Sequence, residues 1–358
     1  MANNFRVILK DQILTHTHIR RYETKLGEVI QCAKAEMNIE EALAQTKAHY
    51  VVIGIPEDAG VKANYGMGGA ATLWTSFLDS FLNIQSNEYM TGKQIFLAGA
   101  FDFSEELNLI HATAPNHEER ITALRTLVHH IDEQVENVVK IICRQGKVPI
   151  IIGGGHNNAY GNIKGAAKGL HQKDLIPLAQ ISVINLDAHA DYRMHEGRHS
   201  GNGFRYADED GYLNKYFAVG VHENYLQDYV IKDVRENPFL EYITFEDIFI
   251  REYKTFMQAI ARATEFIEDG FTGIELDLDS VSHVLSSAMT PSGVSELDAR
   301  KFMHFVATEC SIAYVHICEG AVKLDNDRSD PLTGKLVSYL VTDFIKSHFK
   351  TYQTQKKK

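Results

Sequence analysis

Residues 148–156 read VPIIIGGGH, and residues 181–191 read ISVINLDAHAD. In both stretches an apolar run rich in β-branched residues stops at small or ionisable residues. Runs without polar alternation are typical of strands covered on both faces, as in a parallel sheet. Residues 272–279, TGIELDLD, repeat this form. The three stretches therefore predict an α/β fold with a mainly parallel sheet.

The rest of the chain supports this fold, because segments of helical periodicity alternate with apolar runs. A helical lead-in is expected at residues 1–45, and a frayed, solvated tail at residues 351–358. The strands are predicted at 50–55, 95–98, 148–152, 181–186, 216–221, 242–245, 272–278 and 312–317, and the main helices at 118–144, 253–268, 295–310 and 334–349.

Composition narrows the classes of function. The chain has 358 residues, of which 44% are hydrophobic, as in globular proteins. It carries 36 Lys and Arg against 47 Asp and Glu, a net charge of −11, which argues against nucleic-acid and anionic membrane partners. It shows no apolar run of roughly 18 residues, no signal-peptide pattern and no CxxC pair among its four cysteines. We expect a cytoplasmic protein with reduced thiols that acts on a small molecule.

Ionisable side chains gather directly after three predicted strands, at the edge where open α/β sheets build their sites. Alone, GGGH could be a glycine turn and DLD a helix cap. Together with DAHAD (187–191), they would place four carboxylates and two imidazoles side by side, and burying that charge requires cations. Two divalent metals would neutralise it, and oxygen and nitrogen donors without thiolates suit Mn²⁺ and comparable ions better than a structural zinc site rich in cysteine. The candidate ligands are His156, Asp187, His189, Asp191, Asp277 and Asp279.

This constellation resembles the ureohydrolase superfamily of arginases, agmatinases and formimidoylglutamases. The family's GG-x-H, DAH-x-D and S/E-x-D-x-D motifs correspond to GGGH, DAHAD and ELDLD (275–279). The resemblance implies a single three-layer α/β/α catalytic domain at residues 46–350 and a homo-oligomer, either a trimer or a hexamer. It also implies a binuclear Mn²⁺ site with a bridging hydroxide. The six candidate ligands would hold the two ions, with Asp191 and Asp277 expected to bridge them.

Two further motifs match catalytic segments of the family. His199, in HSG (199–201), corresponds to a proton-shuttle histidine, and an imidazole suits that role because its ordinary pKa lies near neutrality. A proton would pass to the leaving nitrogen through Asp191 and His199. His195 is a competing candidate. Glu319, in CEG (318–320), corresponds to the glutamate that pairs with the amidine or guanidine group, although a structural glutamate is the alternative.

The substrate is indicated by the residues after DAHAD. Arg193 follows in DYR (191–193), where an arginine suits an acidic tail, and HSGNGFR (199–205) resembles the formimidoylglutamase pattern. The resemblance therefore favours hydrolysis of N-formimidoyl-L-glutamate to glutamate and formamide by metal-bound hydroxide. Further substrate contacts are predicted at Asn157, at Glu223, and at Lys62 and Asn64 in the loop 60–66.

Other functions stay open at this stage. Arg193 could form a surface ion pair, and the enzyme would then be an arginase, an agmatinase or another guanidino-compound hydrolase. A related deacetylase fold uses one Zn²⁺ with an Asp/His/Asp set, but GGGH and DLD beside DAHAD favour two metals. A non-catalytic homologue is the third alternative, and the intact set of ligands with His199 argues against it.

Overall fold

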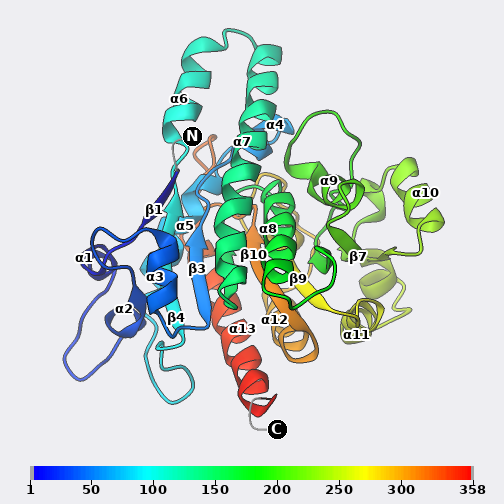
Figure 1. Cartoon of the computed structure of the whole chain (residues 1–358). Helices are drawn as coiled ribbons and strands as arrows, with labels where there is room; N and C mark the ends of the chain where they lie inside the picture. Colours follow the sequence, from blue (N-terminus) through cyan, green and yellow to red (C-terminus); the bar gives the residue numbers. More distant parts are fainter. Residues whose placement is uncertain (1–3, 356–358) are drawn as a thin grey trace.

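The computed structural model describes residues 4–355 of the chain (Figure 1). One sheet has the order β1-β4-β3-β5-β10-β9-β6-β7-β8, and β2 pairs with β4. Every pairing between strands is parallel except β1 with β4. The strands are β1 (Phe5–Val7), β2 (Gln31–Cys32), β3 (Tyr50–Gly54), β4 (Ile95–Phe101), β5 (Val148–Ile152), β6 (Ile181–Leu186), β7 (Leu213–Val221), β8 (Leu240–Thr244), β9 (Phe271–Asp277) and β10 (Ser311–Cys318).

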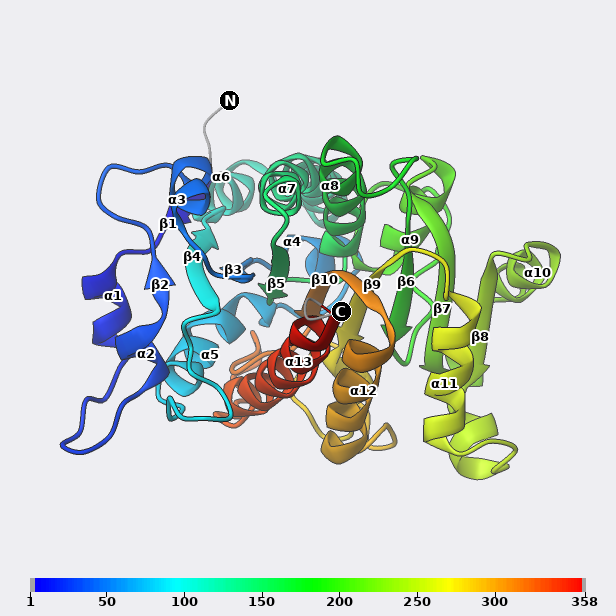
Figure 2. The same cartoon turned by 60° about the horizontal axis from the view of Figure 1, so that its bottom comes forward.

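Helices cover both faces of this sheet, as Figure 2 shows, and the predicted three-layer α/β/α architecture is confirmed. One apolar core lies under α3 (Ile39–Gln45), α7 (His117–Arg144), α8 (Asn158–Gln172) and α9 (Gly203–Glu209). The other lies under α5 (Leu73–Phe81), α11 (Phe256–Phe266), α12 (Glu296–Glu309) and α13 (Thr333–Gln355). The remaining α-helices of the described residues are α1 (Lys10–Thr15), α2 (Leu26–Val29), α4 (Ala59–Ala63), α6 (Ser104–Thr113) and α10 (Asp228–Glu236).

The N-terminal lead-in differs from the prediction, because it also contributes strands to the sheet. β1 pairs antiparallel with β4, and β2 pairs parallel with the same strand. Phe5 packs edge-on against Phe101 with ring centroids 5.1 Å apart, and Ile13 and Leu26 are buried in the core. Strands of two or three residues are too short to produce a readable period in the sequence.

The predicted tail also differs, because residues 351–355 continue α13. Tyr352 stacks on His49 with ring centroids 4.2 Å apart, which holds this turn against the body of the protein. Residues 356–358 of the predicted tail lie outside the described part of the chain. Among the described helices, none combines the length and the apolar character needed to cross a membrane.

The sheet order decides where polar side chains can meet. β5, β10, β9 and β6 are neighbours in the middle of the sheet and run parallel. Their carboxyl ends therefore lie at one edge, although the four strands are far apart in the sequence. In open α/β sheets this edge is where ligands bind.

Candidate metal centre and active site

All six predicted metal ligands lie at this edge of the sheet. His156 follows β5, the DAHAD motif follows β6, and the DLD motif begins at Asp277, the last residue of β9. Each acidic motif closes a local turn of the same kind. Asp187 accepts a hydrogen bond from the backbone N–H of His189 (2.7 Å), and Asp277 accepts one from that of Asp279 (2.8 Å). This Asx turn holds the side chains two residues apart at the same edge.

Four of these side chains form a first cluster around His156. The Nδ1 atom of His156 lies 2.8 Å from Asp191 Oδ2, 3.1 Å from Asp187 Oδ2 and 3.2 Å from Asp277 Oδ2. His156, Asp187 and Asp277 are buried, and Asp191 is partly buried. Asp191 has a left-handed backbone (φ 44°), a conformation that costs energy outside glycine and that is enriched at functional sites.

The second cluster shares Asp187 with the first. His189 Nδ1 lies 3.2 Å from Asp279 Oδ2 and 3.5 Å from Asp187 Oδ1. The shared carboxylate is thus Asp187, whereas Asp191 and Asp277, both expected to bridge, belong to the first cluster alone. The reason is the position of Asp187 between the two histidines, which turns one carboxylate oxygen toward each of them.

The chemistry of the first cluster fits a divalent cation. His156 Nδ1 is fully buried among three carboxylate oxygens, yet it has no hydrogen-bond partner of acceptable geometry. A buried polar atom without a partner is rare and requires an explanation. A cation among these oxygens would take the nitrogen lone pair and neutralise the carboxylates, and an oxygen and nitrogen donor set is one that Mn²⁺ accepts.

The pKa shifts of His189 and Asp277 reflect the same excess of negative charge at this site. Burial lowers the pKa of the His189 imidazole, but Asp279 and Asp187 outweigh it and raise that pKa well above its ordinary value. Burial, together with the charges of Asp279 and Asp187, raises the pKa of the Asp277 carboxyl well above its ordinary range. Both shifts have the direction expected of groups that share a surplus of negative charge, which a cation would neutralise.

A cavity of about 260 Å³ opens over the two clusters, and Asp191, Asp277 and Asp279 form part of its wall. Glu319 lines it as well. One Glu319 oxygen accepts the backbone N–H of His156 (2.8 Å), and the other accepts the Ser287 hydroxyl (3.3 Å). Burial raises the pKa of Glu319 to about 8.

The mouth of this cavity is built by loops. Arg193 donates from Nη1 to Asn64 Oδ1 (3.0 Å) and pairs through Nη2 with Glu196 (2.7 Å), and Asn64 donates to the Ser200 hydroxyl (3.2 Å). Arg193 and Asn64 line the cavity, as predicted, and so does Tyr225, which stacks on His189.

Three predicted substrate contacts are not brought to the cavity. Glu223 binds the Arg251 guanidinium, with Arg251 Nη2 2.8 Å from its Oε2. Lys62 pairs with Asp58 (3.1 Å) and Asp325 (3.4 Å). The charges of Glu223 and Lys62 are thus neutralised by other side chains of the protein. Neither Glu223 nor Lys62 lines the cavity.

The third is Asn157, which is buried in the glycine turn below the cavity. Its amide donates to Glu57 (3.2 Å). Glu57 also accepts the backbone N–H of Gly155 (3.1 Å) and the Asn158 amide (2.7 Å), so it organises the turn that presents His156.

His199 is fully buried and is not part of the cavity wall. Its Nδ1 accepts the backbone N–H of Gly201 (3.1 Å), and its Nε2 lies 3.3 Å from Glu196. Burial, reinforced by the charge of Arg193, lowers the pKa of His199 to about 4. This differs from the near-neutral group expected of a proton shuttle. The competing His195 lies 3.4 Å from Glu209 and is not part of the wall either.

The sequence model of the arginase family matches residues 48–343. The chain belongs to the arginase family. This membership agrees with the ureohydrolase resemblance and confirms the prediction of a hydrolase of this class.

Individual arginase-family relatives agree with this placement. A formimidoylglutamase of Streptococcus pyogenes is 26% identical over 301 residues, which cover 82% of this chain and 84% of that protein. The structure of a formimidoylglutamase from Bacillus subtilis has a TM-score of 0.70 at 16% identity, covering 93% of this chain and 95% of that one. A Trypanosoma cruzi formiminoglutamase with Mn²⁺ has a TM-score of 0.67 at 19% identity, covering 92% and 99%.

Two residues that support this arginase-family site are not evident from the motifs. Glu57 follows β3 at the same edge of the sheet, so the rule that located the ligands could have located it. Arg198 is fully buried, donates from Nε to Asp132 (2.8 Å) and from Nη2 to the Asn157 carbonyl (2.8 Å). These hydrogen bonds hold Arg198 in the interior of the protein, and its neighbour His199 is buried beside it. No local sequence pattern indicates that Arg198 pairs with Asp132, which lies 66 residues earlier in the chain.

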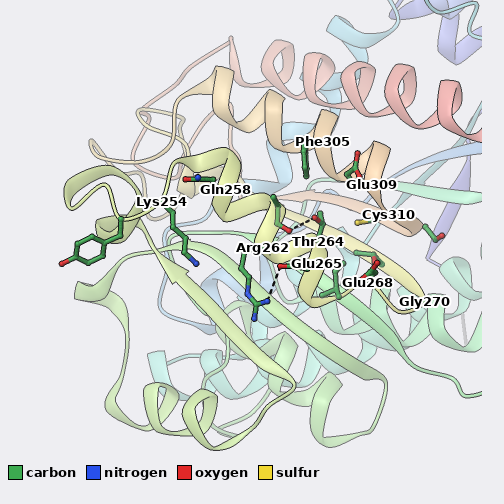
Figure 3. Close-up of a pocket in the computed structure, with 15 residues that line it drawn as sticks. Lys254, Gln258, Arg262, Thr264, Glu265, Glu268, Gly270, Phe305, Glu309 and Cys310 are labelled. Carbon is green, nitrogen blue, oxygen red and sulfur yellow. Dashed lines mark hydrogen bonds and ion pairs between the residues drawn. The ribbon is translucent and has the colours of Figure 1, made fainter.

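A larger hollow, of about 770 Å³, lies at the opposite edge of the sheet (Figure 3). It is lined by Thr272 and Ser311, at the starts of β9 and β10. One of its charged groups, Arg262, binds Glu241 (2.7 Å) and lies 3.6 Å from Glu265. None of the described residues that line it carries a buried side-chain nitrogen or oxygen without a hydrogen-bond partner, and such atoms mark the metal centre.

Proposed function

We propose that this arginase-family hydrolase adds water to N-formimidoyl-L-glutamate and releases L-glutamate and formamide, using two Mn²⁺ ions. The observation that carries the proposal is the polarity of one cavity, which has acidic groups and two histidine-centred clusters at its floor and an arginine at its mouth. A substrate with a cationic amidine at one end and carboxylates at the other matches that polarity. The formimidoylglutamases among the relatives support it.

The floor would hold the two ions. His156, Asp191 and Asp277 would bind one, His189 and Asp279 the other, and Asp187 would bind both. When bound, such ions lower the pKa of water toward neutrality and so supply the nucleophile. The Trypanosoma cruzi formiminoglutamase, whose crystal structure was solved with Mn²⁺, supports this choice of metal.

The wall would orient the amidine. Glu319 is a buried carboxyl group in the cavity, and a cationic amidine beside it would favour its charged form and form charge-assisted hydrogen bonds. The hydrogen bond from the His156 backbone fixes the direction of this carboxylate. Asp191 would carry a proton to the leaving nitrogen of glutamate, and its position in the cavity wall supports this role.

The mouth would select the acidic tail. Arg193 donates hydrogen bonds to Asn64 and Glu196. Because a guanidinium has five N–H donors, Arg193 retains donors for a substrate carboxylate. Asn64 holds the guanidinium from the other side and keeps it over the cavity.

One observation favours a different substrate. The ion pair between Arg193 and Glu196 satisfies the positive charge at the mouth, and an arginine neutralised in this way would not attract an acidic tail. A guanidino compound such as agmatine, which has no carboxylate, would then be hydrolysed instead.

A product assay separates the two. The Mn²⁺-loaded protein is incubated with formimidoylglutamate, arginine, agmatine and guanidinobutyrate, and formamide and urea are measured. We expect formamide from formimidoylglutamate and little urea from the others. Rapid release of urea from agmatine or arginine, without release of formamide, would refute the substrate and leave the hydrolase class unchanged.

A further inference from the structure

A buried network lies beneath the first metal cluster. It consists of Glu275 on β9 and of Tyr314 and His316 on β10, all three without solvent exposure. Tyr314 donates its hydroxyl to Glu275 Oε1 (2.6 Å), and His316 Nδ1 lies 2.6 Å from Glu275 Oε2. The other ring nitrogen of His316 faces the carbonyl of Gly153 (3.3 Å), so the imidazole is fixed at both ends.

This network reaches the metal centre at one atom. Glu275 Oε2 lies 3.4 Å from His156 Nε2, whereas His156 Nδ1 faces the three carboxylates of the first cluster. The two nitrogens of one imidazole thus face opposite ways, one toward the candidate ion and the other toward a buried carboxylate. Histidines that bind metals are commonly held by a carboxylate on the second nitrogen, which fixes the tautomer and the ring orientation.

We infer that Glu275 is a positioning residue. His156 Nε2 is buried, lies 3.4 Å from Glu275 Oε2 and has no hydrogen-bond partner as the side chains stand. With the metal bound, Glu275 would accept the Nε2–H of His156 and so keep the lone pair of Nδ1 directed at the metal. The inference rests on the two-metal site proposed above. Tyr314 and His316 hold the carboxylate in place, because each of them binds one of its oxygens.

The same side chains could be read as a further metal site, since His156, Glu275, His316 and Cys318 bring their ligand atoms within 4.8 Å of one another. The hydrogen bonds decide against that reading. Both oxygens of Glu275 already accept short hydrogen bonds, and both nitrogens of His316 face oxygen acceptors. Because these lone pairs and protons are already used in hydrogen bonds, Glu275 and His316 are not free to bind a metal ion.

The test is Mn²⁺ binding by the full-length protein, measured by titration and by electron paramagnetic resonance. Glu275→Gln keeps the size of the side chain and removes its charge. We expect the variant to bind the ion held by His156 roughly 10- to 100-fold more weakly, as for other outer-shell partners. The ion at His189 should be retained. At a Mn²⁺ concentration that fills both sites of the wild type, the variant should show isolated Mn²⁺ where the wild type shows a coupled pair.

Two tyrosine variants serve as controls that distinguish a specific effect on Mn²⁺ binding from a general loss of folding. Tyr314→Phe removes a donor to Glu275 and should weaken the same ion by a smaller factor. Tyr50→Phe removes an equally buried hydroxyl, whose partner is His348 (2.9 Å), and should leave Mn²⁺ binding unchanged. Melting of the metal-free proteins identifies any variant that is unfolded.

Three outcomes would overturn the inference. If Glu275→Gln binds both ions like the wild type, Glu275 does not position His156, while the proposed function survives. If the variant loses an ion beyond the two at the cavity floor, the network is a metal site. If the wild type binds no Mn²⁺, the proposed function fails together with this inference.

Discussion

The floor and the mouth of the cavity are built by different means. At the floor, strand register brings the side chains together: Leu186 of β6 pairs with Leu276 of β9, so Asp187 and Asp277 lie side by side one residue further along. At the mouth, Arg193 and Glu196 stand on a loop and keep 39% and 38% of their side chains exposed. The pairing of the strands therefore fixes the position of the proposed metal ligands. The position of the proposed specificity residue Arg193 depends instead on an exposed ion pair.

The largest effect is expected at the floor. Asp277→Asn removes a carboxylate of the first cluster, and we expect Mn²⁺ affinity and activity to fall by more than the roughly 10- to 100-fold that an outer-shell partner costs. The metal-free melting temperature should stay equal or rise, because burial and the charges of Asp279 and Asp187 disfavour an ionised group at this position, and the amide is neutral without taking up a proton. The amide oxygen can still accept the backbone N–H of Asp279. Titration and thermal melting measure the two effects. A lower metal-free melting temperature would show that the floor is not strained by its charge.

Acidification should act on the same groups. Since neighbouring carboxylates raise the pKa of His189 above its ordinary value despite its burial, the metal-free imidazole holds its proton at neutral pH. Metal binding must displace that proton, so Mn²⁺ affinity should increase with pH. One proton per ion corresponds to roughly tenfold per pH unit, or roughly 100-fold from about pH 6.5 to about pH 8.5. Isothermal titration across this range checks the slope, and an affinity independent of pH would contradict it.

At the mouth, the expected effect falls on substrate capture alone. Arg193→Ala should lower kcat/KM for formimidoylglutamate by roughly 10- to 150-fold, the equivalent of about 1.5–3 kcal/mol for hydrogen bonds to a charged group. The Mn²⁺ content should not change. The matched control is Arg251→Ala, which breaks a comparable exposed pair with Glu223 outside the cavity and should leave kcat/KM unchanged. Equal losses in the two variants would mean that Arg193 does not read the substrate.

The smallest effect is expected behind the mouth. His199→Asn should change kcat less than about tenfold, because the imidazole is buried away from the cavity and its pKa is held at about 4. A positioned acid or base contributes roughly 10²–10⁴-fold. A loss of that size, with the metals retained, would show that the loop opens during turnover and brings His199 to the substrate.

The two regions also differ in how far the sequence predicts them. All six proposed ligands follow from the rule that polar residues after parallel strands meet at one edge, and the structure gathers them there. The rule does not give the direction of each side chain. Asp191 and Asp277 were expected to bridge, but the position of Asp187 between two histidines makes Asp187 the carboxylate that the two clusters share.

At the mouth, sequence reasoning found Arg193 and Asn64 and misplaced Glu223, Lys62 and Asn157. The partners that draw two of these away from the cavity are Arg251, 28 residues after Glu223, and Glu57, 100 residues before Asn157. Such pairings depend on tertiary contacts and leave no local periodicity. The same holds for the first strand of the sheet, whose three residues carry too short a pattern to read.

The central claim is that the carboxyl edge of β5, β6 and β9 holds two metal ions. Elemental analysis after reconstitution with Mn²⁺ and removal of free metal tests it most directly. We predict two ions per chain, spaced roughly 3.5–4 Å apart as in other two-metal hydrolytic sites and therefore magnetically coupled. One tightly bound ion or none, in protein that is folded and loaded with Mn²⁺, would contradict the account.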